Sequence, residues 1–420
     1  MSRTRHRGRL IPADQAEAAY RYLPFEVPAG AGAGAVAVRL GYDRTGAVLD
    51  LGVFDPERFR GWSGGAREGF VITPAAATPG YLPGPLPAGE WRVILGLYQV
   101  PEAGVDFTVE VQVEAAGGKA GSGRLRPPPV PEPGPLPARP PSRRLPALPG
   151  RRWVAGDLHA HTLHSDGALT VDQLACLARA RGLDFLAVTD HNTVSHHAEL
   201  PAATARTGVL LLPGQEVTTP TGHANCFGDT GWIDFRQPAD HWLATAEAHG
   251  GFLSINHPLA GPWAWHQPLS RPTPLTEAWH GTWDGFDPLP LAWWRTAGGI
   301  PIGGSDFHRP GEIIQLGRPT TWVEVQPKVQ LDPYTDVEGY DLFDVLDALA
   351  AGRVALAATP TGPVILRHAD QLLVVDAAGT ALHVPDAPPR AITSDLLAVP
   401  AGPGPYRLIR PTGTTVAFTP

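Results

Sequence analysis

Residues 156–167, with the sequence GDLHAHTLHSDG, gather three histidines and two aspartates in a chain that has 16 histidines among 420 residues. Imidazoles and carboxylates are the groups that a divalent metal ion or a general base requires, and they also occur in plain polar turns. His159 and His161 are two residues apart, so at the end of a β-strand both side chains point to the same face. The spacing therefore suits two ligands of one ion.

Other apolar runs of the sequence also end in histidines and acids. The runs DFLAVTDH, GVLLLPGQE, GFLSINH and GIPIGGSDFH end in His191, Glu216, His257, and Asp306 with His308. His223 follows shortly after Glu216 in TGHANCFG. One histidine at a strand end is more often an ordinary polar group than a ligand, but a series at successive strand ends predicts a metal site. The other histidines keep the ordinary interpretation, and His164 is the first candidate for an exception.

Helical segments separate these runs. TVDQLACLARARG predicts a helix with Thr170 as its N-cap, Gln173 closing a capping box and Gly182 just past its end. Further helices are predicted in ADHWLATAEAHG, LAWWRTAGG and YDLFDVLDALAAGR. Strands that alternate with helices indicate parallel strands joined by crossovers, in an α/β barrel or an open sheet. In α/β barrels the active site is assembled where the strands end, so the polar residues would converge there.

Two regions of different character flank this part. Residues 23–114 alternate apolar and polar residues between Gly and Pro turns, which indicates a small antiparallel sandwich. Residues 126–150 are too rich in proline for helix or sheet and are typical of a semi-rigid spacer. We predict an N-terminal β-sandwich module at 1–125, a proline-rich linker at 126–150, a catalytic domain at 151–358 and a small C-terminal β module at 359–420.

Composition excludes several classes of protein. A net charge of −8 argues against a surface that coats a nucleic-acid backbone, so nucleic acid is expected only as a small nucleotide substrate. Cys176 and Cys226 form no CxxC pair, which argues against a disulfide framework or a thiolate zinc site. The basic N-terminus precedes no apolar run, and no run is long enough to span a membrane. We expect a cytoplasmic protein without a membrane partner.

The motifs DLHAHTLHSDG, FLAVTDHNT, LLPGQEVTTPTGHANCFG, INHP and GGSDFHRP resemble, in order and spacing, those of the polymerase and histidinol phosphatase (PHP) superfamily of metal-dependent hydrolases. GQEVTTPTGHAN and GRPTTWVEV look most like the CehA/McbA-type members, some of which cleave a carbamate ester. The resemblance covers residues 153–325, and FRGWSGGAREGFVITPAAATPGYLPGPLPAGEW looks like the N-terminal module that accompanies some members. It implies a distorted (β/α)7 barrel with two or three divalent ions.

The resemblance also implies how the ligands are shared. One ion would be held by His159, His161, Glu216 and Asp306. A second would share the bridging Glu216 and add His223 and His257. A third would be held by Asp166, His191 and His308, and aspartate at 166, where other members have histidine, favours two ions over three. Nitrogen and carboxylate ligands without thiolates suit Mn, Zn or Fe.

Such a site would activate a water molecule for hydrolysis, with Glu216, Asp306 and Arg309 as the catalytic residues. An anionic phosphoester would need Arg309 or Arg318 near the ions, whereas a neutral aryl ester would need aromatic walls, for which the chain offers Trp263, Trp265, Trp279 and Trp283. His280 stands where the CehA-like pattern usually has asparagine, which weakens a transfer of substrate from that group.

The leading hypothesis is therefore a phosphoesterase for small-molecule or nucleotide phosphoesters. A carboxylic ester or carbamate hydrolase of the CehA type is the first alternative, and a non-catalytic binding protein whose metal site is structural or vestigial is the second. The long proline spacer would let the sandwich module pack against a second subunit, so we expect a homodimer.

Overall fold

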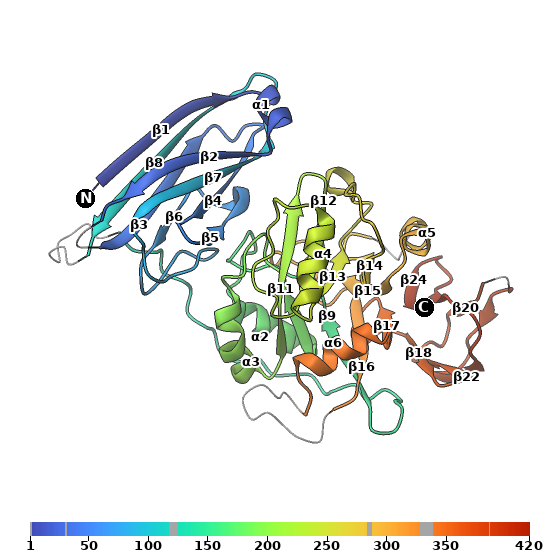
Figure 1. Cartoon of the computed structure of the whole chain (residues 1–420). Helices are drawn as coiled ribbons and strands as arrows, with labels where there is room; N and C mark the ends of the chain where they lie inside the picture. Colours follow the sequence, from blue (N-terminus) through green and yellow to red (C-terminus); the bar gives the residue numbers. More distant parts are fainter. Residues whose placement is uncertain (1, 30–31, 117–124, 284–287, 328–338, 386) are drawn as a thin grey trace. The chain divides into compact units, whose positions relative to one another are not determined.

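The computed structural model describes residues 2–420 except 30–31, 117–124, 284–287, 328–338 and 386 (Figure 1). The chain forms two compact units. The first unit comprises Met1–Glu132 together with two short segments, Leu163–Asp166 and His191–His196. The second unit comprises Pro133–Thr162, Gly167–Asp190 and His197–Pro420.

The first unit is built from two antiparallel four-stranded sheets (Figure 1). One sheet has the order β1 (Ser2–Leu10), β8 (Val105–Ala115), β3 (Ala33–Tyr42) and β6 (Gly69–Ile72). The other has the order β2 (Tyr20–Val27), β7 (Gly89–Gln99), β4 (Val48–Phe54) and β5 (Phe59–Trp62). The short helices α1 (Pro12–Glu17) and η1 (Gly64–Ala66) lie in the connections. One apolar core holds residues of both sheets.

The pattern of β8 explains how this core forms. Its sequence VDFTVEVQVEA places Val105, Phe107, Val109, Val111 and Val113 on one face, and all five are buried. Successive side chains of a strand point to opposite faces, so the polar residues between them face away from the core. The same alternation in the other strands buries one face of each sheet, as a sandwich requires.

The second unit contains a thirteen-stranded mixed sheet. Its strands, in spatial order, are β15 (Ile300–Gly304), β14 (Leu275–His280), β13 (Phe252–Ile255), β12 (Gly222–Phe227), β11 (Leu210–Thr219), β10 (Phe185–Val188), β9 (Arg152–Asp157), β16 (Thr320–Val325), β17 (Val354–Ala357), β24 (Thr415–Thr419), β23 (Tyr406–Ile409), β20 (Ala381–His383) and β21 (Arg390–Ala391). A separate sheet contains β18 (Val364–His368), β19 (Gln371–Val375) and β22 (Leu396–Pro400).

The strands predicted to be parallel are parallel in two groups. β9, β10 and β11 pair in parallel, as do β13, β14 and β15. β12, which the sequence analysis did not assign, runs antiparallel between the two groups. The ladder is not closed among the described residues: the edge strand β15 is linked to β16 by the Thr321 hydroxyl, which bonds the N–H and the carbonyl of Gly303, both at 2.8 Å. The fold is therefore mixed α/β.

Helices lie in the connections between the strands of the second unit (Figure 1). They are α2 (Val171–Arg181), η2 (His197–Glu199), α3 (Leu200–Thr207), α4 (Ala239–Ala248), η3 (Gly261–Trp263), α5 (Pro288–Ala297) and α6 (Leu342–Ala350). The predicted ends of α2 are confirmed, because Thr170 and Gln173 form the capping box and Gly182 ends the helix with φ 77°. None of the helices in the described part of the chain has the length and apolar character that a bilayer crossing requires.

Part of the proline-rich segment is bound along the second unit. Leu148 N–H donates to Glu324 (2.9 Å), and the Trp153 indole donates to the Pro146 carbonyl (3.0 Å). The Arg179 side chain donates to the Pro137 carbonyl (2.9 Å). Residues from Pro133 onward therefore belong to this unit instead of spanning open space.

Candidate metal centre

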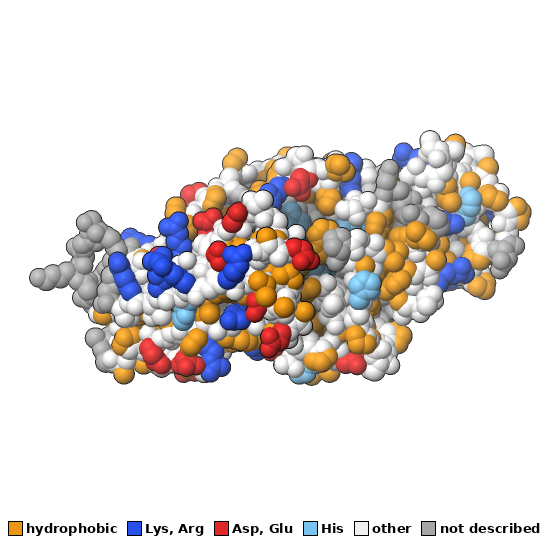
Figure 2. Space-filling model, turned by 90° about the horizontal axis from the view of Figure 1, so that it is seen from above, with side chains coloured by type: hydrophobic (Ala, Val, Ile, Leu, Met, Phe, Trp, Pro, Cys, Tyr) orange, Lys and Arg blue, Asp and Glu red, His pale blue; other side chains and the backbone are white. Residues whose placement is uncertain are grey.

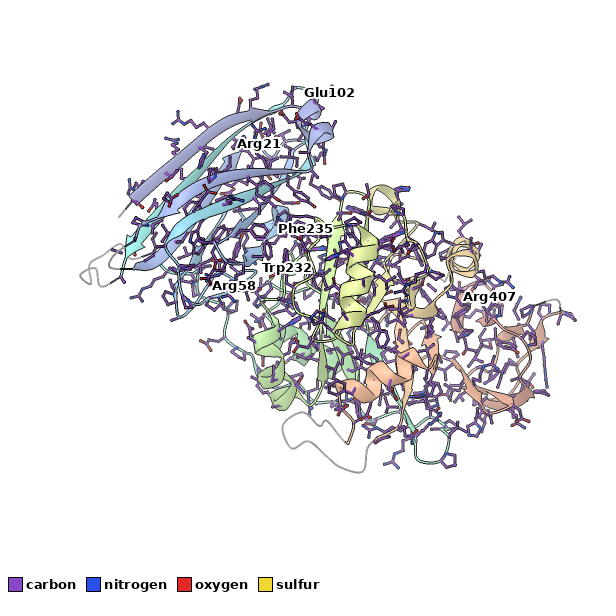
Figure 3. All side chains as sticks on the ribbon, viewed as in Figure 1. Arg21, Arg58, Glu102, Trp232, Phe235 and Arg407 are labelled. Carbon is purple, nitrogen blue, oxygen red and sulfur yellow. The ribbon has the colours of Figure 1, made fainter. Side chains whose placement is uncertain are left out.

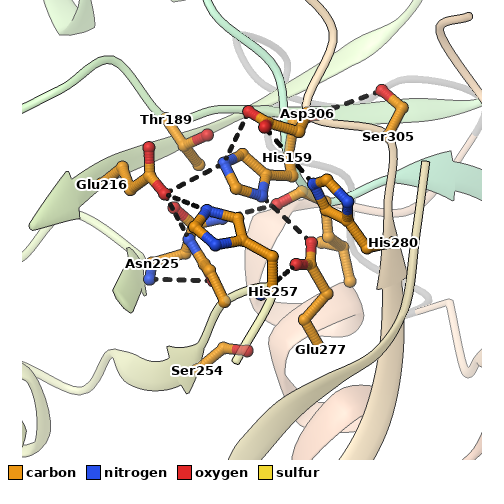
Figure 4. A network of polar contacts seen from close by, with 12 residues as sticks. His159, Thr189, Glu216, Asn225, Ser254, His257, Glu277, His280, Ser305 and Asp306 are labelled. Atoms are coloured by element: carbon orange, nitrogen blue, oxygen red, sulfur yellow. Dashed lines mark hydrogen bonds and ion pairs between the residues drawn. The ribbon is translucent and has the colours of Figure 1, made fainter. Parts of the chain in front are cut away.

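Buried histidines and carboxylates converge in the second unit (Figure 4). Four of the predicted ligands, which are His159, His161, Glu216 and Asp306, offer ligand atoms that all lie within 4.8 Å of one another. His159 and His161 follow β9, Glu216 lies on β11, and Asp306 follows β15. Parallel strands bring their ends to one edge of the sheet, which is why His159 and Asp306, 147 positions apart in the sequence, meet here.

Glu216 lies at the middle of this cluster. Its Oε1 is 3.3 Å from His159 Nε2, 3.2 Å from His223 Nδ1 and 3.3 Å from His257 Nε2. Its Oε2 is 3.5 Å from His161 Nε2. The two oxygens of one carboxylate thus face different imidazoles, which is the arrangement that a bridging ligand of two ions needs.

Asp306 is the second carboxylate that contacts His159 and His161. Its Oδ1 lies 3.0 Å from His161 Nε2 and 3.2 Å from His159 Nε2. Its backbone has φ 59°, an uncommon value for a residue with a side chain, which indicates that the surroundings hold it there. The predicted ligand His308 stacks on His161 at 4.2 Å between ring centroids, and its Nδ1 bonds the Asp306 carbonyl (2.9 Å).

The donor set fits a divalent cation. His159 Nε2 is buried close to two carboxylates, yet it forms no hydrogen bond of normal geometry with either. His257 Nδ1 is also buried without a hydrogen bond. Buried polar atoms are nearly always satisfied in folded proteins, so a nitrogen lone pair facing carboxylate oxygens indicates a place for a cation.

Electrostatics in the metal-free protein point the same way. Burial by itself would lower the pKa of His159, but the carboxylates of Asp306, Glu216 and Glu277 outweigh it and raise the pKa well above the ordinary value. Burial would raise the pKa of Asp306, but the neighbouring histidines, His159 first, lower it well below the ordinary value. In the metal-free protein a proton on His159 supplies the positive charge beside these carboxylates that a bound cation would otherwise supply.

Hydrogen bonds to the backbone fix the segments that carry the ligands. Asp157, at the end of β9, accepts from the N–H groups of His159 (3.1 Å), Ser305 (2.9 Å) and Gly317 (2.7 Å). Burial raises the pKa of Asp157, although these bonds oppose the shift. Asp190 accepts from the N–H and the hydroxyl of Thr162 at 2.8 and 2.6 Å, so it caps the turn after His161.

The end of β11 is fixed in a similar way. Asn256 donates to Glu216 Oε1 (2.9 Å), and the Gln215 amide bonds the carbonyl and the N–H of Ile233 at 2.8 and 2.9 Å. In the same loop Trp232 and Phe235 pack edge to face, with ring centroids 6.0 Å apart (Figure 3). The position of the Glu216 carboxylate is therefore fixed by Asn256 and by the Gln215–Ile233 hydrogen bonds.

Sequence analysis missed Glu277 and gave His280 an ordinary role. Both lie on β14, a strand that was not predicted, and both are buried beside His159 and Asp306 (Figure 4). Residues three apart in a regular strand point to opposite faces, but a β-bulge lies between Glu277 and Trp279. The extra residue turns both side chains toward the cluster, and no sequence periodicity signals such a bulge.

Glu277 holds the two histidines next to it. Its Oε1 lies 3.0 Å from His159 Nδ1, and its Oε2 accepts from the backbone N–H of His257 (2.6 Å). The carboxylate places the proton of His159 on Nδ1 and directs the Nε2 lone pair at the cluster. Metal-binding histidines are commonly oriented by a carboxylate in this way.

Two predicted ligands, Asp166 and His191, belong to the first unit, where His191 Nε2 lies 3.6 Å from Asp166 Oδ1. Arg67 holds their segment by donating to the carbonyls of Ser165 (2.9 Å) and Leu163. His164 accepts from Gly80 N–H (3.3 Å), which gives it a structural role in this unit. That Asp166 and His191 hold one ion together with His308 stays a prediction.

The residues predicted to contact substrate differ in exposure. The Arg309 side chain is 51% exposed and pairs with Glu312 at 3.3 Å, and Arg318 is exposed as well. Trp263 is 44% exposed, whereas Trp279 is buried with Leu356 and Phe418 in an apolar cluster. On the face shown in Figure 2 acidic and basic side chains are interspersed.

Cys226 is buried beside Thr230, with 3.2 Å between Sγ and Oγ1. Burial raises the pKa of its thiol to about 12, so it carries no nucleophilic thiolate at neutral pH.

Short stretches of the chain are similar to bacterial phosphoesterases, while no family model matches it. The chain is 46% identical over 66 residues to a 3',5'-nucleoside bisphosphate phosphatase of Chromobacterium violaceum. It is 38% identical over 63 residues to a 5'-3' exoribonuclease of Haemophilus influenzae, and 40% identical over 68 residues to the 5'-3' exoribonuclease Rnm of Escherichia coli. These matches cover 15–16% of this chain and 23% of each relative's length.

Two solved structures are similar over a larger part of the chain. One is a two-domain protein containing a predicted PHP-like metal-dependent phosphoesterase from Bacteroides vulgatus, with 17% identity and a TM-score of 0.44, covering 67% of this chain and 98% of that one. The other is an amidohydrolase from Chromobacterium violaceum, with 19% identity and a TM-score of 0.31, covering 49% and 98%.

Proposed function

We propose that the chain is a metal-dependent phosphoesterase of the PHP type that hydrolyses phosphoesters of small molecules or nucleotides. The observation that carries this proposal is the buried carboxylate of Glu216, whose oxygens face the imidazoles of four histidines. The names of the relatives matched at 38–46% identity, a phosphatase and an exoribonuclease, support a phosphoester as the substrate.

His159, His161, Glu216 and Asp306 would hold one ion, and His223 and His257 would share Glu216 for a second. Asp166, His191 and His308 remain the proposed ligands of a third. Mn, Zn or Fe bound there would lower the pKa of a water molecule and polarise the phosphoryl group under attack. The chain itself contributes the orientation of these ligands, and Arg309, next to His308, is proposed to bind the anionic substrate.

A carboxylic ester or carbamate hydrolase of the CehA/McbA type is the second candidate function. Trp263, which follows the ligand His257 by six positions and is 44% exposed, favours it because an aryl ester would need such a surface. Arg309 favours the phosphoester. We also propose that the second unit is a distorted (β/α)7 barrel. The protein is further proposed to be a homodimer, which light scattering at micromolar concentration tests.

A substrate panel separates the two candidates. p-Nitrophenyl phosphate, bis-p-nitrophenyl phosphate, p-nitrophenyl acetate and 1-naphthyl methylcarbamate would each be assayed with Mn and with Zn. We expect turnover of the phosphate substrates, and turnover of the last two alone would overturn the phosphoesterase proposal. Metal analysis of the purified protein tests the binding-protein alternative, which predicts less than one equivalent of transition metal and no turnover.

A further inference from the structure

His280 lies inside the cluster although it belongs to none of the proposed ligand groups. It is the last residue of β14 and is 2% exposed. Its ring is 5.1 Å from that of His257 and 6.2 Å from that of His159, centroid to centroid. With His159 and Glu277 it also forms a group whose ligand atoms could reach one ion. Its hydrogen bonds distinguish a ligand from a positioning residue.

The contacts of Nδ1 fix the tautomer of His280. The backbone N–H of Thr282 donates to Nδ1 (3.2 Å), and the Thr282 hydroxyl oxygen lies 2.7 Å from the same atom. A nitrogen that accepts an N–H bond carries its lone pair there, so the ring proton of neutral His280 resides on Nε2. Nε2 then has no lone pair to offer to an ion, which excludes His280 as a ligand in this arrangement.

The Nε2–H group of His280 instead faces Asp306. It lies 3.3 Å from Asp306 Oδ2, while the other oxygen, Oδ1, faces His159 and His161 (Figure 4). The two carboxylate oxygens thus have separate partners.

We infer that His280 is a positioning residue, which holds Asp306 Oδ2 through Nε2–H so that Oδ1 is presented to the ion. The inference rests on the proposed function, in that it takes the cluster to bind a divalent metal. Hydrogen bonds to ligating carboxylates affect metal affinity about 10- to 100-fold in other metalloproteins. Thr282 acts one step further out, because its N–H selects the tautomer that can donate.

Two substitutions separate positioning from the alternatives. Glutamine places an amide N–H near the position of Nε2, so His280→Gln keeps the donor to Asp306. Asparagine places its amide near Nδ1, so His280→Asn keeps the contact with Thr282 and loses that donor. His197→Gln is the matched control, since His197 bonds a backbone carbonyl, Gly214, in the same unit (3.0 Å).

The test is the affinity of each full-length protein for Zn, measured by competition with a chelating dye, with circular dichroism of the metal-free proteins as a check of folding. We expect His280→Asn to bind Zn roughly 10- to 100-fold more weakly, and His280→Gln and the control to bind within about threefold of the parent. Equal losses in the Asn and Gln variants, or no loss in either, would overturn the inference. A parent that binds no Zn, Mn or Fe would instead overturn the proposed function, and the inference with it.

A second measurement does not depend on metal affinity. Nitrogen NMR of the metal-free parent, labelled with ¹⁵N-histidine, reports which ring nitrogen of His280 carries the proton, and the signal is assigned by its absence in His280→Gln. Protonation at Nε2 alone is expected. A signal from the Nδ1–H tautomer would contradict the positioning role whatever the affinities are.

Discussion

Glu277→Gln tests how much of the metal affinity depends on a residue that touches no ion. Glu277 is 1% exposed and both its partners are donors: His159 Nδ1–H at 3.0 Å and His257 N–H at 2.6 Å. A glutamine has one acceptor oxygen and one NH2 group, so it can satisfy only one of the two. If its oxygen keeps the shorter bond to His257, its NH2 faces His159 Nδ1 and favours the tautomer with the proton on Nε2.

That proton would occupy the lone pair that an ion needs. A hydrogen bond to a charged group contributes about 1.5–3 kcal/mol, and each ~1.4 kcal/mol is a tenfold change in affinity. We therefore expect Glu277→Gln to weaken metal binding by roughly 10- to 100-fold, in agreement with the usual effect of residues that orient metal ligands. The assay is dye competition with Zn on the metal-free protein.

Glu324→Gln is the control for this experiment. Glu324 is a buried glutamate of the same unit whose partners are also donors, Leu148 N–H at 2.9 Å and the Arg151 guanidinium at 3.2 Å. It lies outside the cluster, so its replacement should lower stability and leave metal affinity unchanged. Equal affinities of the parent and Glu277→Gln, or equal losses in both variants, would refute the reasoning.

Three further predictions concern Glu216, Arg309 and Asp50. Glu216→Gln should reduce activity by orders of magnitude while circular dichroism shows a retained fold, because it removes the charge shared by two ions; a fully active variant would contradict the two-ion assignment. Arg309→Ala should slow p-nitrophenyl phosphate and leave ester substrates unaffected, which parallel kcat/KM measurements would show. Burial raises the pKa of Asp50 to about 7 from 3.8, so the unfolded chain loses this proton first and the folded state loses stability as the pH rises between these values. In urea unfolding of the metal-free protein, Asp50→Asn should exceed the parent in stability by more at about pH 8 than at about pH 5, since each pKa unit is worth ~1.4 kcal/mol; an equal margin at both would be evidence against a buried charge.

Much of the second unit follows from local signals in the sequence. The capping box at Thr170 and Gln173 and the stop at Gly182 define α2 because capping depends on a few neighbouring residues. The apolar runs that became β9, β10, β11, β13 and β15 were predicted for a similar reason. His159, His161, Glu216 and Asp306 were then found together because they follow or lie near the ends of strands in one sheet.

What the sequence did not reveal depends on distant partners. The strand state of β12 and β14 is set by the neighbours they pair with. The grouping of segments 163–166 and 191–196 with the first unit rests on contacts such as that of Arg67 with Ser165, almost 100 positions apart. No local pattern records contacts of this kind.

The bulge in β14 shows why the supporting residues were harder to find than the ligands. Without it, Glu277 and Trp279 would share one face and His280 would point to the other. With it, Ala278 and Trp279 pack into the apolar cluster with Leu356 and Phe418, and Glu277 and His280 turn to the metal centre. One extra residue therefore places a carboxylate on His159 and an imidazole on Asp306. Deleting Ala278 would close the bulge and leave Glu277 and His280 two positions apart, on one face of a regular strand with Trp279 on the other. Both side chains should then still face the cluster, so the deletion variant should bind Zn about as tightly as the parent in dye competition, and a large loss of affinity would contradict this account of the bulge.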